Sequence, residues 1–242
     1  MSAAQSLDLL FLGSGNAFAA QGRAFSSFLL NGRYLFDCGP TVLQQLRKAN
    51  LPSSDIDAVL ISHFHADHFF GLPFLILDAW REQRAKDLWI AGPPGIEERT
   101  MGLLRLGYEM LTRRLEFKLH FIDVADGMEA EIAGLPFTAV SVEHVAELDC
   151  FAFRARLNGR SLVYSGDSKL CDSLLDLVPG ADVVVLECAC GDEPVHLSPD
   201  DVARIAARAP KAQTIVTHLD GHDHPGGWRG LHVAQDLARF SF

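Results

Sequence analysis

The sequence predicts an α/β fold of four layers, in which two packed β-sheets are covered on their outer sides by helices (αββα). Apolar runs typical of buried strands alternate with segments of helical periodicity, and this series occurs twice along the chain. At 242 residues and 48% hydrophobic content, the chain is long enough and apolar enough for a large core. Because no linker, low-complexity tract or solenoid-type repeat interrupts it, we expect a single domain over residues 1–242.

The first series of elements ends at Ala91. Within it, Asn31-Gly32 is a strong signal for a two-residue hairpin turn, because both residue types tolerate the positive φ that such a turn needs. Apolar residues at helical spacing, among them Leu72 and Ile76, indicate a helix. In chain order the expected elements are strand Leu7–Leu12, hairpin strands Phe28–Leu30 and Tyr34–Phe36, helix Pro40–Ala49, strand Ala58–Ser62, helix Gly71–Arg84 and strand Leu88–Ala91.

The second series repeats these signals. Asn158-Gly159 is again a hairpin turn, and Ser198-Pro199 begins a helix with a serine N-cap, a proline at the first helical position and acidic residues in the first turn. The expected elements are strand Phe137–Val142, hairpin strands Phe151–Leu157 and Ser161–Tyr164, strand Val183–Leu186, a helix from Ser198 to about Arg208, and strand Thr214–Thr217.

Composition limits the class of protein. The formal charge of −10 argues against a surface that holds nucleic acid through phosphate neutralisation alone. No apolar stretch reaches the roughly 18 residues of a transmembrane helix, so we expect no membrane span. The five cysteines form neither a paired framework nor a C-x-x-C zinc motif, and we expect reduced thiols in a cytoplasmic protein. They are Cys38, Cys150, Cys171, Cys188 and Cys190.

The richest chemical feature is the six-residue segment His63-Phe64-His65-Ala66-Asp67-His68, which directly follows the expected strand Ala58–Ser62. Imidazole nitrogen and carboxylate oxygen suit Zn²⁺, Mn²⁺ or Fe²⁺. Scattered histidines would be solvated or hydrogen-bonded core residues, but four ligand-type residues at this spacing indicate a metal loop. Because His63 and His65 are two residues apart, they can face one cation while the following carboxylate and imidazole face a second.

Further ligand-type residues stand just after three expected strands of the second series. They are His144, Asp167 and His218. Strand ends on one side of a sheet converge on one cleft, so these side chains complete the loop to a dinuclear centre. The expected first ion is bound by His63, His65 and His144, the second by Asp67, His68 and His218, and Asp167 bridges both.

This ordered set resembles the metallo-β-lactamase superfamily of dinuclear metallohydrolases, and the resemblance spans nearly the whole chain. It implies the αββα sandwich of that superfamily and two divalent metal ions, Zn or Mn, with Fe also open. Asp37, in Leu35-Phe36-Asp37-Cys38-Gly39, matches the superfamily's first acidic motif. That match implies that Asp37 supports the metal loop without binding metal.

Within the superfamily the chain is most similar to the ribonuclease Z-like phosphodiesterase branch. The segments that carry this resemblance are Phe11-Leu12-Gly13-Ser14-Gly15, Leu35-Phe36-Asp37-Cys38-Gly39, Gly71-Leu72-Pro73 and Thr217-His218. True β-lactamases usually have a cysteine in their second metal set, whereas Asp167 stands at the bridging position here. The resemblance therefore argues against a β-lactam substrate.

The chain departs from bacterial ribonuclease Z in one respect. Those enzymes carry a long arm that clasps transfer RNA between the positions of His144 and Asp167, where this chain has only 22 residues. The short spacing and the acidic charge argue against transfer RNA as a partner and favour a small-molecule phosphodiester. The spacing is similar to that of the cyclic-phosphate phosphodiesterases of the branch, although their cysteine-rich zinc site is missing.

The resemblance also suggests a proton donor. His196 stands where the branch has a histidine proposed to protonate the leaving oxygen, and Glu187 resembles an acid thought to orient it. Alternatively, His196 is an ordinary surface histidine beside a helix cap. His222 and His224 have no accompanying acid or strand, so whether either contributes to the site stays open.

These observations predict a metal-dependent hydrolase, favouring a phosphodiesterase that acts on a small or cyclic phosphodiester through a hydroxide held between two cations. Asp67 would orient this nucleophile as well as bind metal. The alternatives are ester, lactone or thioester hydrolysis at the same site and ribonuclease Z-like RNA processing. A non-enzymatic binding protein would be marked by lost ligands, and none is lost. The physiological substrate, the metal and the oligomeric state, including a homodimer, stay open.

Overall fold

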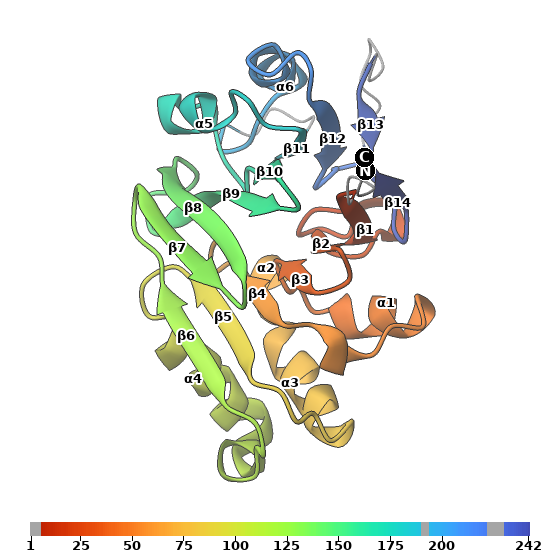
Figure 1. Ribbon diagram of the computed structural model, residues 1–242, viewed down its shortest axis with the longest axis vertical. Coiled ribbons are helices and arrows are strands. Elements are labelled where there is room, and N and C mark those ends of the chain that lie inside the picture. Colours follow the sequence, from red (N-terminus) through yellow and green to blue (C-terminus); the bar gives the residue numbers. More distant parts are fainter. Residues whose placement is uncertain (1–5, 190–193, 222–229) are drawn as a thin grey trace.

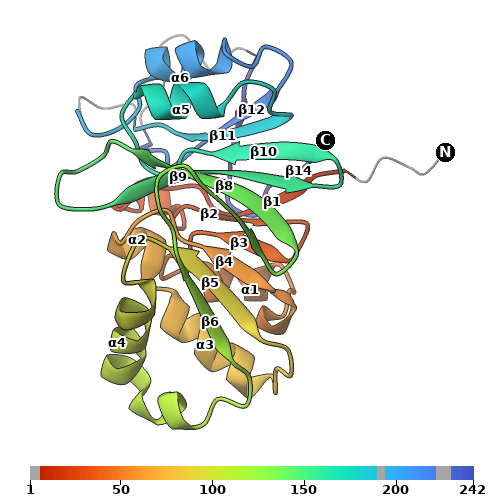
Figure 2. The same ribbon diagram turned by 60° about the vertical axis from the view of Figure 1, so that its left-hand side comes forward.

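Two β-sheets packed face to face form the centre of the computed structural model, and helices lie on the outer side of each sheet (Figure 1). The structure describes residues 6–189, 194–221 and 230–242. Figure 2 shows the layers in order, from helices α5 (Asp172–Leu177) and α6 (Pro199–Ala206) through the two sheets to helices α1 (Val42–Lys48), α3 (Leu72–Arg81) and α4 (Ile96–Tyr108). The predicted αββα sandwich is confirmed.

The first sheet has the strand order β14-β1-β2-β3-β4-β5-β6. β1, β2 and β3 pair antiparallel, whereas β3 to β6 run parallel, so the carboxyl ends of β3 to β6 lie on one edge. The bounds are β1 Asp8–Gly13, β2 Ser27–Leu30, β3 Tyr34–Phe36, β4 Ala58–Leu60, β5 Leu88–Gly92, β6 Leu119–Asp123 and β14 Arg239–Ser241.

The second sheet has the strand order β13-β12-β11-β10-β9-β8-β7. β7 to β10 are antiparallel and β10 to β13 are parallel. The bounds are β7 Met128–Ile132, β8 Leu135–Val142, β9 Cys150–Leu157, β10 Arg160–Tyr164, β11 Val183–Glu187, β12 Gln213–Thr217 and β13 His232–Val233. The two sheets thus share a plan, an antiparallel part followed by a parallel part.

Aromatic rings fill the space between the sheets. Phe28 stacks on Phe36 with ring centroids 4.7 Å apart, and Tyr164 from the second sheet forms a T-shaped pair with Phe28, with centroids 5.2 Å apart. These rings belong to one continuous buried cluster. Each sheet has a further, separate cluster between it and its own helices. The central cluster fixes the two sheets relative to each other, because burying such side chains contributes about 1.5–3 kcal/mol each.

The predicted turn and cap chemistry is confirmed. Asn31 and Gly32 have φ of 49° and 68°, and Asn158 and Gly159 have φ of 57° and 77°, as a type I′ hairpin turn requires. Ser198 caps α6 in a capping box, in which its hydroxyl accepts a hydrogen bond from the backbone N–H of the third helical residue. All strands expected from the sequence are present.

Several expected bounds need correction. Helix α1 begins at Val42 and not at Pro40, α3 ends at Arg81 and not at Arg84, and α6 ends at Ala206 and not at Arg208. Strand β4 ends at Leu60, because the backbone N–H of Ser62 donates to the Asp37 carboxylate instead of to a neighbouring strand. The expected strand Ala58–Ser62 was therefore two residues too long.

No helix or strand with defined bounds is expected from the sequence between Ala91 and Phe137, where the structure has α4, β6 and β7. Several short elements, whose sequences carry little periodicity, were also not expected. These are α2 (Ala66–Phe69), α5, β13, β14 and the 3₁₀ helices η1 (Ala20–Gly22), η2 (Ser53–Asp55) and η3 (Glu109–Arg113).

Within the described residues, no helix combines the length and apolar character needed to cross a bilayer. Cys38, Cys150 and Cys171 are buried free thiols.

Candidate metal centre

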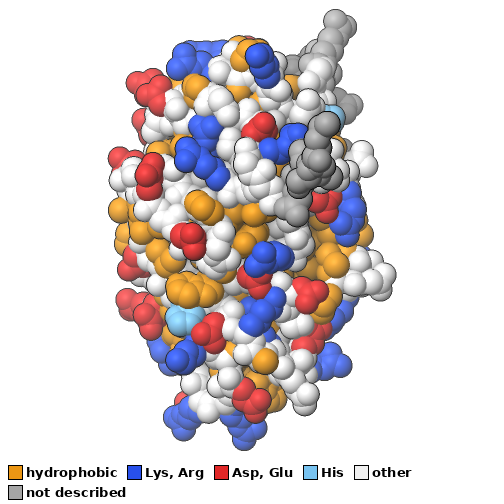
Figure 3. Space-filling view, in the orientation of Figure 1, with side chains coloured by type: hydrophobic (Ala, Val, Ile, Leu, Met, Phe, Trp, Pro, Cys, Tyr) orange, Lys and Arg blue, Asp and Glu red, His pale blue; other side chains and the backbone are white. Residues whose placement is uncertain are grey.

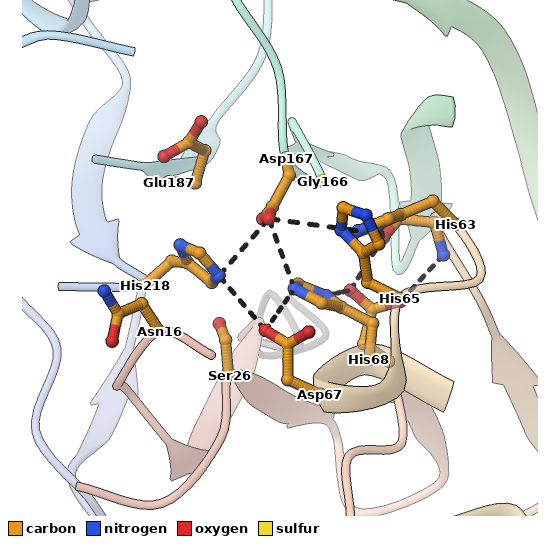
Figure 4. A network of polar contacts seen from close by, with 12 residues as sticks. Asn16, Ser26, His63, His65, Asp67, His68, Gly166, Asp167, Glu187 and His218 are labelled. Carbon is orange, nitrogen blue, oxygen red and sulfur yellow. Dashed lines mark hydrogen bonds and ion pairs between the residues drawn. The ribbon is translucent and has the colours of Figure 1, made fainter. Parts of the chain in front are cut away.

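The predicted ligand residues meet where strands of both sheets end (Figure 4). The metal loop follows β4 and its last three residues lie in α2, while His144, Asp167 and His218 follow β8, β10 and β12. Six of the seven side chains are buried, with exposed fractions from 0% for His63 and His68 to 7% for Asp67, and His65 is half-buried. Charged and imidazole groups are rarely gathered inside a protein without a compensating partner.

Three imidazoles and a carboxylate form the first group, which we call the histidine cluster: His63, His65, His144 and Asp167. The His65 Nδ1 atom lies 2.9 Å from His63 Nε2 and 3.3 Å from His144 Nε2. The Asp167 Oδ2 atom lies 3.9 Å from both Nε2 atoms. The ligand atoms therefore face one point.

The second group, which we call the carboxylate cluster, consists of Asp67, His68 and His218. The Asp67 Oδ2 atom lies 3.2 Å from His68 Nε2 and 3.4 Å from His218 Nε2. The same Oδ2 atom of Asp167 that borders the histidine cluster lies 3.4 Å and 3.3 Å from these two nitrogens. Asp167 thus stands between the two clusters, where the sequence predicted a bridging residue.

An unsatisfied ligand atom indicates that these residues fit divalent metal ions. Asp167 Oδ1 is buried, and within the described part of the chain it has no hydrogen-bond partner. A buried polar atom left without a partner costs about 1–3 kcal/mol, which a bound cation would offset. Imidazole with carboxylate is also the donor set that divalent transition metals favour. The clusters are therefore suited to bind divalent metal ions.

Asp37 supports the metal loop from behind. Its Oδ2 atom accepts hydrogen bonds from the Tyr164 hydroxyl at 2.6 Å and the Ser62 hydroxyl at 2.9 Å, and lies 2.7 Å from His68 Nδ1. Its Oδ1 atom accepts the backbone N–H of Ser62 at 2.7 Å. A carboxylate on the far nitrogen of an imidazole fixes which nitrogen faces the metal. The position of Asp37 agrees with the supporting role that the resemblance implied.

Sequence reasoning missed Ser62 and Tyr164. The Ser62 hydroxyl also lies 3.0 Å from His63 Nδ1, so this serine connects Asp37 to the histidine cluster. Its one sequence signal is its position directly before the loop. Tyr164 has no local signal, because a tyrosine at the end of an apolar strand is equally typical of an ordinary core residue.

Strained backbone marks the site. His218 and Asp37 have φ of 57° and 55°, in the left-handed region that side chains other than glycine rarely adopt. Such positions cost about 1–3 kcal/mol each and persist where the surrounding structure fixes them. Here the strain turns the two side chains toward the metal loop.

Two glycines let the loop lie close to its support. A Cβ atom on Gly39 would come within 2.0 Å of the Asp67 carbonyl oxygen, and one on Gly71 within 2.2 Å of the Gly39 carbonyl oxygen. The backbone N–H of Cys38 donates to the His68 carbonyl oxygen at 2.7 Å. This close backbone contact sets the depth of the loop in the site.

The electrostatics differ between the clusters. Burial, with repulsion from His68, holds the pKa of the His63 imidazole well below its usual value. Burial opposes the charge of His68 as well, but three neighbouring carboxylates, Asp167 foremost, raise the pKa of that imidazole well above its usual value. Burial also disfavours the charge of Asp167, yet His218 and His68 hold the pKa of this carboxyl well below its usual range.

His196 and Glu187 lie together beside the clusters. The Glu187 Oε1 atom lies 3.0 Å from His196 Nδ1 and accepts the backbone N–H groups of Leu197 at 3.0 Å and Ser168 at 3.2 Å. His196 Nδ1 is 3.9 Å from Asp167 Oδ2, and its side chain is 11% exposed. His196 thus borders the centre and is not an ordinary surface histidine. His222 and His224 lie outside the described residues.

Comparisons with known proteins agree with this geometry. The β-lactamase superfamily domain matches residues 32–219. Ribonuclease Z of Methanosarcina acetivorans is 26% identical over 270 aligned residues, which cover 88% of this chain and 87% of that protein. The metallo-β-lactamase fold protein YhfI of Bacillus subtilis superposes with a TM-score of 0.78 at 21% identity, over 98% of this chain and 100% of that one. A diphosphatase of the PhnP family superposes with a TM-score of 0.76 at 22% identity, over 98% of both chains.

The name of the first relative refers to RNA, so the comparisons give no support to the expectation that excluded transfer RNA. The family match and the sequence relatives do support the metal-dependent hydrolysis that the two clusters indicate. With the domain match covering most of its length, this chain belongs to the metallo-β-lactamase superfamily and is a ribonuclease Z-like, metal-dependent hydrolase.

Proposed function

We propose that the protein is a dinuclear phosphodiesterase that acts on a small or cyclic phosphodiester, with two Zn²⁺ or Mn²⁺ ions, or Fe²⁺, in the two clusters. One observation carries the proposal: a single carboxylate oxygen of Asp167 lies within 3.9 Å of ligand nitrogens from both clusters. One residue can serve two cations only when both sites open toward it. Two-metal centres of this kind are typical of phosphodiester hydrolysis.

Bound divalent ions would supply an activated water at neutral pH and offset negative charge on the phosphate. The chain's own residues orient the reaction. The Asp67 Oδ2 atom lies 3.2–3.4 Å from both imidazoles of its cluster, which leaves its second oxygen to orient the nucleophile by accepting a hydrogen bond from it. Burial of these groups keeps bulk water away and strengthens each interaction.

His196 is the proposed proton donor to the departing alkoxide. The Glu187 carboxylate lies 3.0 Å from the His196 Nδ1 atom and holds the ring beside the clusters. The ring centroids of His196 and His144 are 4.9 Å apart, so a substrate bound at the clusters would lie within reach of the imidazole. A positioned acid of this kind contributes roughly 10²–10⁴-fold in rate.

The short connection between the ligand residues supports a small substrate. Between His144 and Asp167 the chain forms only β9, β10 and their turn, and no arm projects from this fully described stretch. On the face shown in Figure 3, acidic and basic side chains are interspersed over the coloured surface. Such a surface offers little of the continuous positive charge that binds an RNA backbone.

RNA processing is the second candidate, because the relatives matched over most of the chain are ribonucleases by name. The two candidates differ in substrate size. We expect efficient turnover of bis(p-nitrophenyl) phosphate or a cyclic nucleotide phosphate by the metal-loaded protein, slower turnover of an aryl ester, and no site-specific cleavage of a transfer-RNA precursor. Precise cleavage of the precursor at low micromolar enzyme would establish the second candidate instead.

The leaving group tests the role of His196. His196→Ala should retain both ions and slow phosphodiesters with poor alkoxide leaving groups by about 10²-fold or more, while p-nitrophenolate esters, whose leaving group needs no proton, are scarcely affected. His120→Ala is a matched control, since His120, which lies on β6, forms a similar histidine–carboxylate pair with Asp87. Equal slowing of both substrate classes would contradict a proton-donor role.

A further inference from the structure

Two buried hydroxyls meet beside the carboxylate cluster. Ser26 directly precedes β2 and Thr217 is the last residue of β12, and their side-chain oxygens are 3.3 Å apart. Ser26 is 2% exposed and Thr217 is fully buried. Figure 4 shows the Ser26 hydroxyl directed toward the space between His218 and Asp67. The pair therefore borders the place where the carboxylate cluster gathers its ligand atoms.

One of the two hydroxyl hydrogens of this pair is not used in the bond between them. Each hydroxyl carries one hydrogen, and the bond between them uses only one of the two. Within the described residues, neither hydroxyl makes another hydrogen bond. Buried hydroxyl hydrogens are normally donated to an acceptor, so the remaining hydrogen calls for a partner that binds from the open side of the site.

The backbone holds the pair rigidly. The N–H of Ser26 donates to the Gly15 carbonyl oxygen at 3.0 Å, and Gly15 in turn bridges to Leu219, which follows His218. A Cβ atom on Gly13 would come within 2.0 Å of the Phe25 carbonyl oxygen, so the loop before Ser26 is packed too closely to shift freely. A donor fixed in this way can stabilise charge without reorganising during a reaction.

We propose that the Ser26 hydroxyl donates a hydrogen bond to a phosphoryl oxygen of the substrate bound on the Asp67 and His218 side of the centre. Thr217 is a positioning residue: its hydroxyl donates the shared hydrogen bond to the Ser26 oxygen, which leaves the Ser26 hydrogen for the substrate. The proton stays on Ser26 throughout, and no covalent bond forms. This inference rests on the proposed phosphodiesterase function and assigns that reaction one more catalytic residue.

The test combines turnover with ligand binding. Ser26→Ala in the metal-loaded protein should lower kcat for bis(p-nitrophenyl) phosphate by about 10- to 100-fold and weaken the Kd for inorganic phosphate by roughly tenfold, with metal content and Tm retained. Thr217→Val should show a smaller loss of the same kind, and Ser26→Thr, which keeps the hydroxyl, should recover most of the activity. Ser27→Ala is the matched control, because that neighbouring hydroxyl is equally buried but donates to the Phe25 carbonyl oxygen.

Unchanged kcat and phosphate affinity in Ser26→Ala would overturn the inference. A loss of metal or of Tm that accounts for the whole loss of activity would also overturn it, in favour of a purely structural hydroxyl pair, and Ser26→Thr provides the folded comparison if the alanine variant is unstable. If the wild-type protein hydrolyses no phosphodiester, the proposed function fails, while the phosphate Kd of the variants still decides whether Ser26 binds phosphate.

Discussion

The histidine cluster and the carboxylate cluster share one loop and one bridging aspartate, yet they differ in charge. Around His63 the neighbours are imidazoles, and burial holds its pKa well below the usual value. Around His68 the neighbours are carboxylates, and its pKa lies well above the usual value. Two equally buried imidazoles therefore have pKa values shifted in opposite directions. The direction of each shift depends on which charged residues the fold places next to the imidazole. We expect the two metal sites to differ in how they load.

Removing the residue common to both clusters should have the largest effect. Asp167→Ala deletes the oxygen that borders four ligand nitrogens, so both ions should bind weakly and activity should fall about 10³-fold or more. Elemental analysis and turnover measure the outcome, with Asp172→Ala on the exposed start of α5 as control. Loss of a single ion from Asp167→Ala would mean that the clusters do not share this ligand.

A change confined to one cluster should separate the two sites. His65→Ala removes the half-buried imidazole that lies 2.9 Å and 3.3 Å from the other two nitrogens of the histidine cluster. The ion of that cluster should be lost preferentially, with about one ion per chain remaining in the carboxylate cluster, because its own ligands are untouched. Anomalous scattering from crystals of the variant would locate the remaining ion. Simultaneous loss of both ions would show that the sites form one cooperative unit.

Smaller changes behind the carboxylate cluster should affect it more than the histidine cluster, because Asp37 contacts His68 directly and reaches His63 only through Ser62. Tyr164→Phe removes one donor to Asp37, and Asp37→Asn removes the charge that lies 2.7 Å from His68 Nδ1. Residues that orient a metal ligand typically change metal affinity by about 10–100-fold, so the asparagine variant should approach that range and the phenylalanine variant should change less. Competition with a chelator measures the affinity of each site. An equal loss at the histidine cluster would contradict the separation.

The smallest effect concerns protons. Because the folded pKa of His68 is raised, its charge stabilises the metal-free protein below the usual histidine pKa of 6.5, and this contribution is lost as pH rises through the raised value. Metal binding at pH 7 should therefore release about one proton, from the carboxylate cluster, whereas His63 has none to release. Calorimetry in buffers of different ionisation enthalpy measures this release. We expect less release from Asp37→Asn, and no release from the wild-type protein at pH 7 would mean that His68 is neutral before metal binds.

The clusters also differ in how visible they are in the sequence. The loop from His63 to His68 is evident because its ligands are contiguous. His144, Asp167 and His218 were found only because each follows an apolar run that reads as a strand, and the structure places all three at strand ends. Apolar patterns show where each strand ends, and the direction of the strand decides at which edge of the sheet that end lies.

The supporting contacts could not be predicted in the same way. Tyr164 reaches Asp37 across 127 positions, and Ser26 reaches Thr217 across 191. Likewise β14 pairs with β1, so strands from the two ends of the chain lie side by side. These contacts depend on how the two sheets and the chain ends pack, and a local pattern of residue types contains no record of such distant neighbours.

Metal stoichiometry tests the central claim most directly. After mild loading with Zn²⁺ or Mn²⁺ and removal of excess metal, elemental analysis of the wild-type protein should give two ions per chain, since two clusters with one shared carboxylate are present. A titration should further resolve one site that releases a proton near pH 7 and one that does not. At most one ion per chain after loading would contradict the dinuclear account.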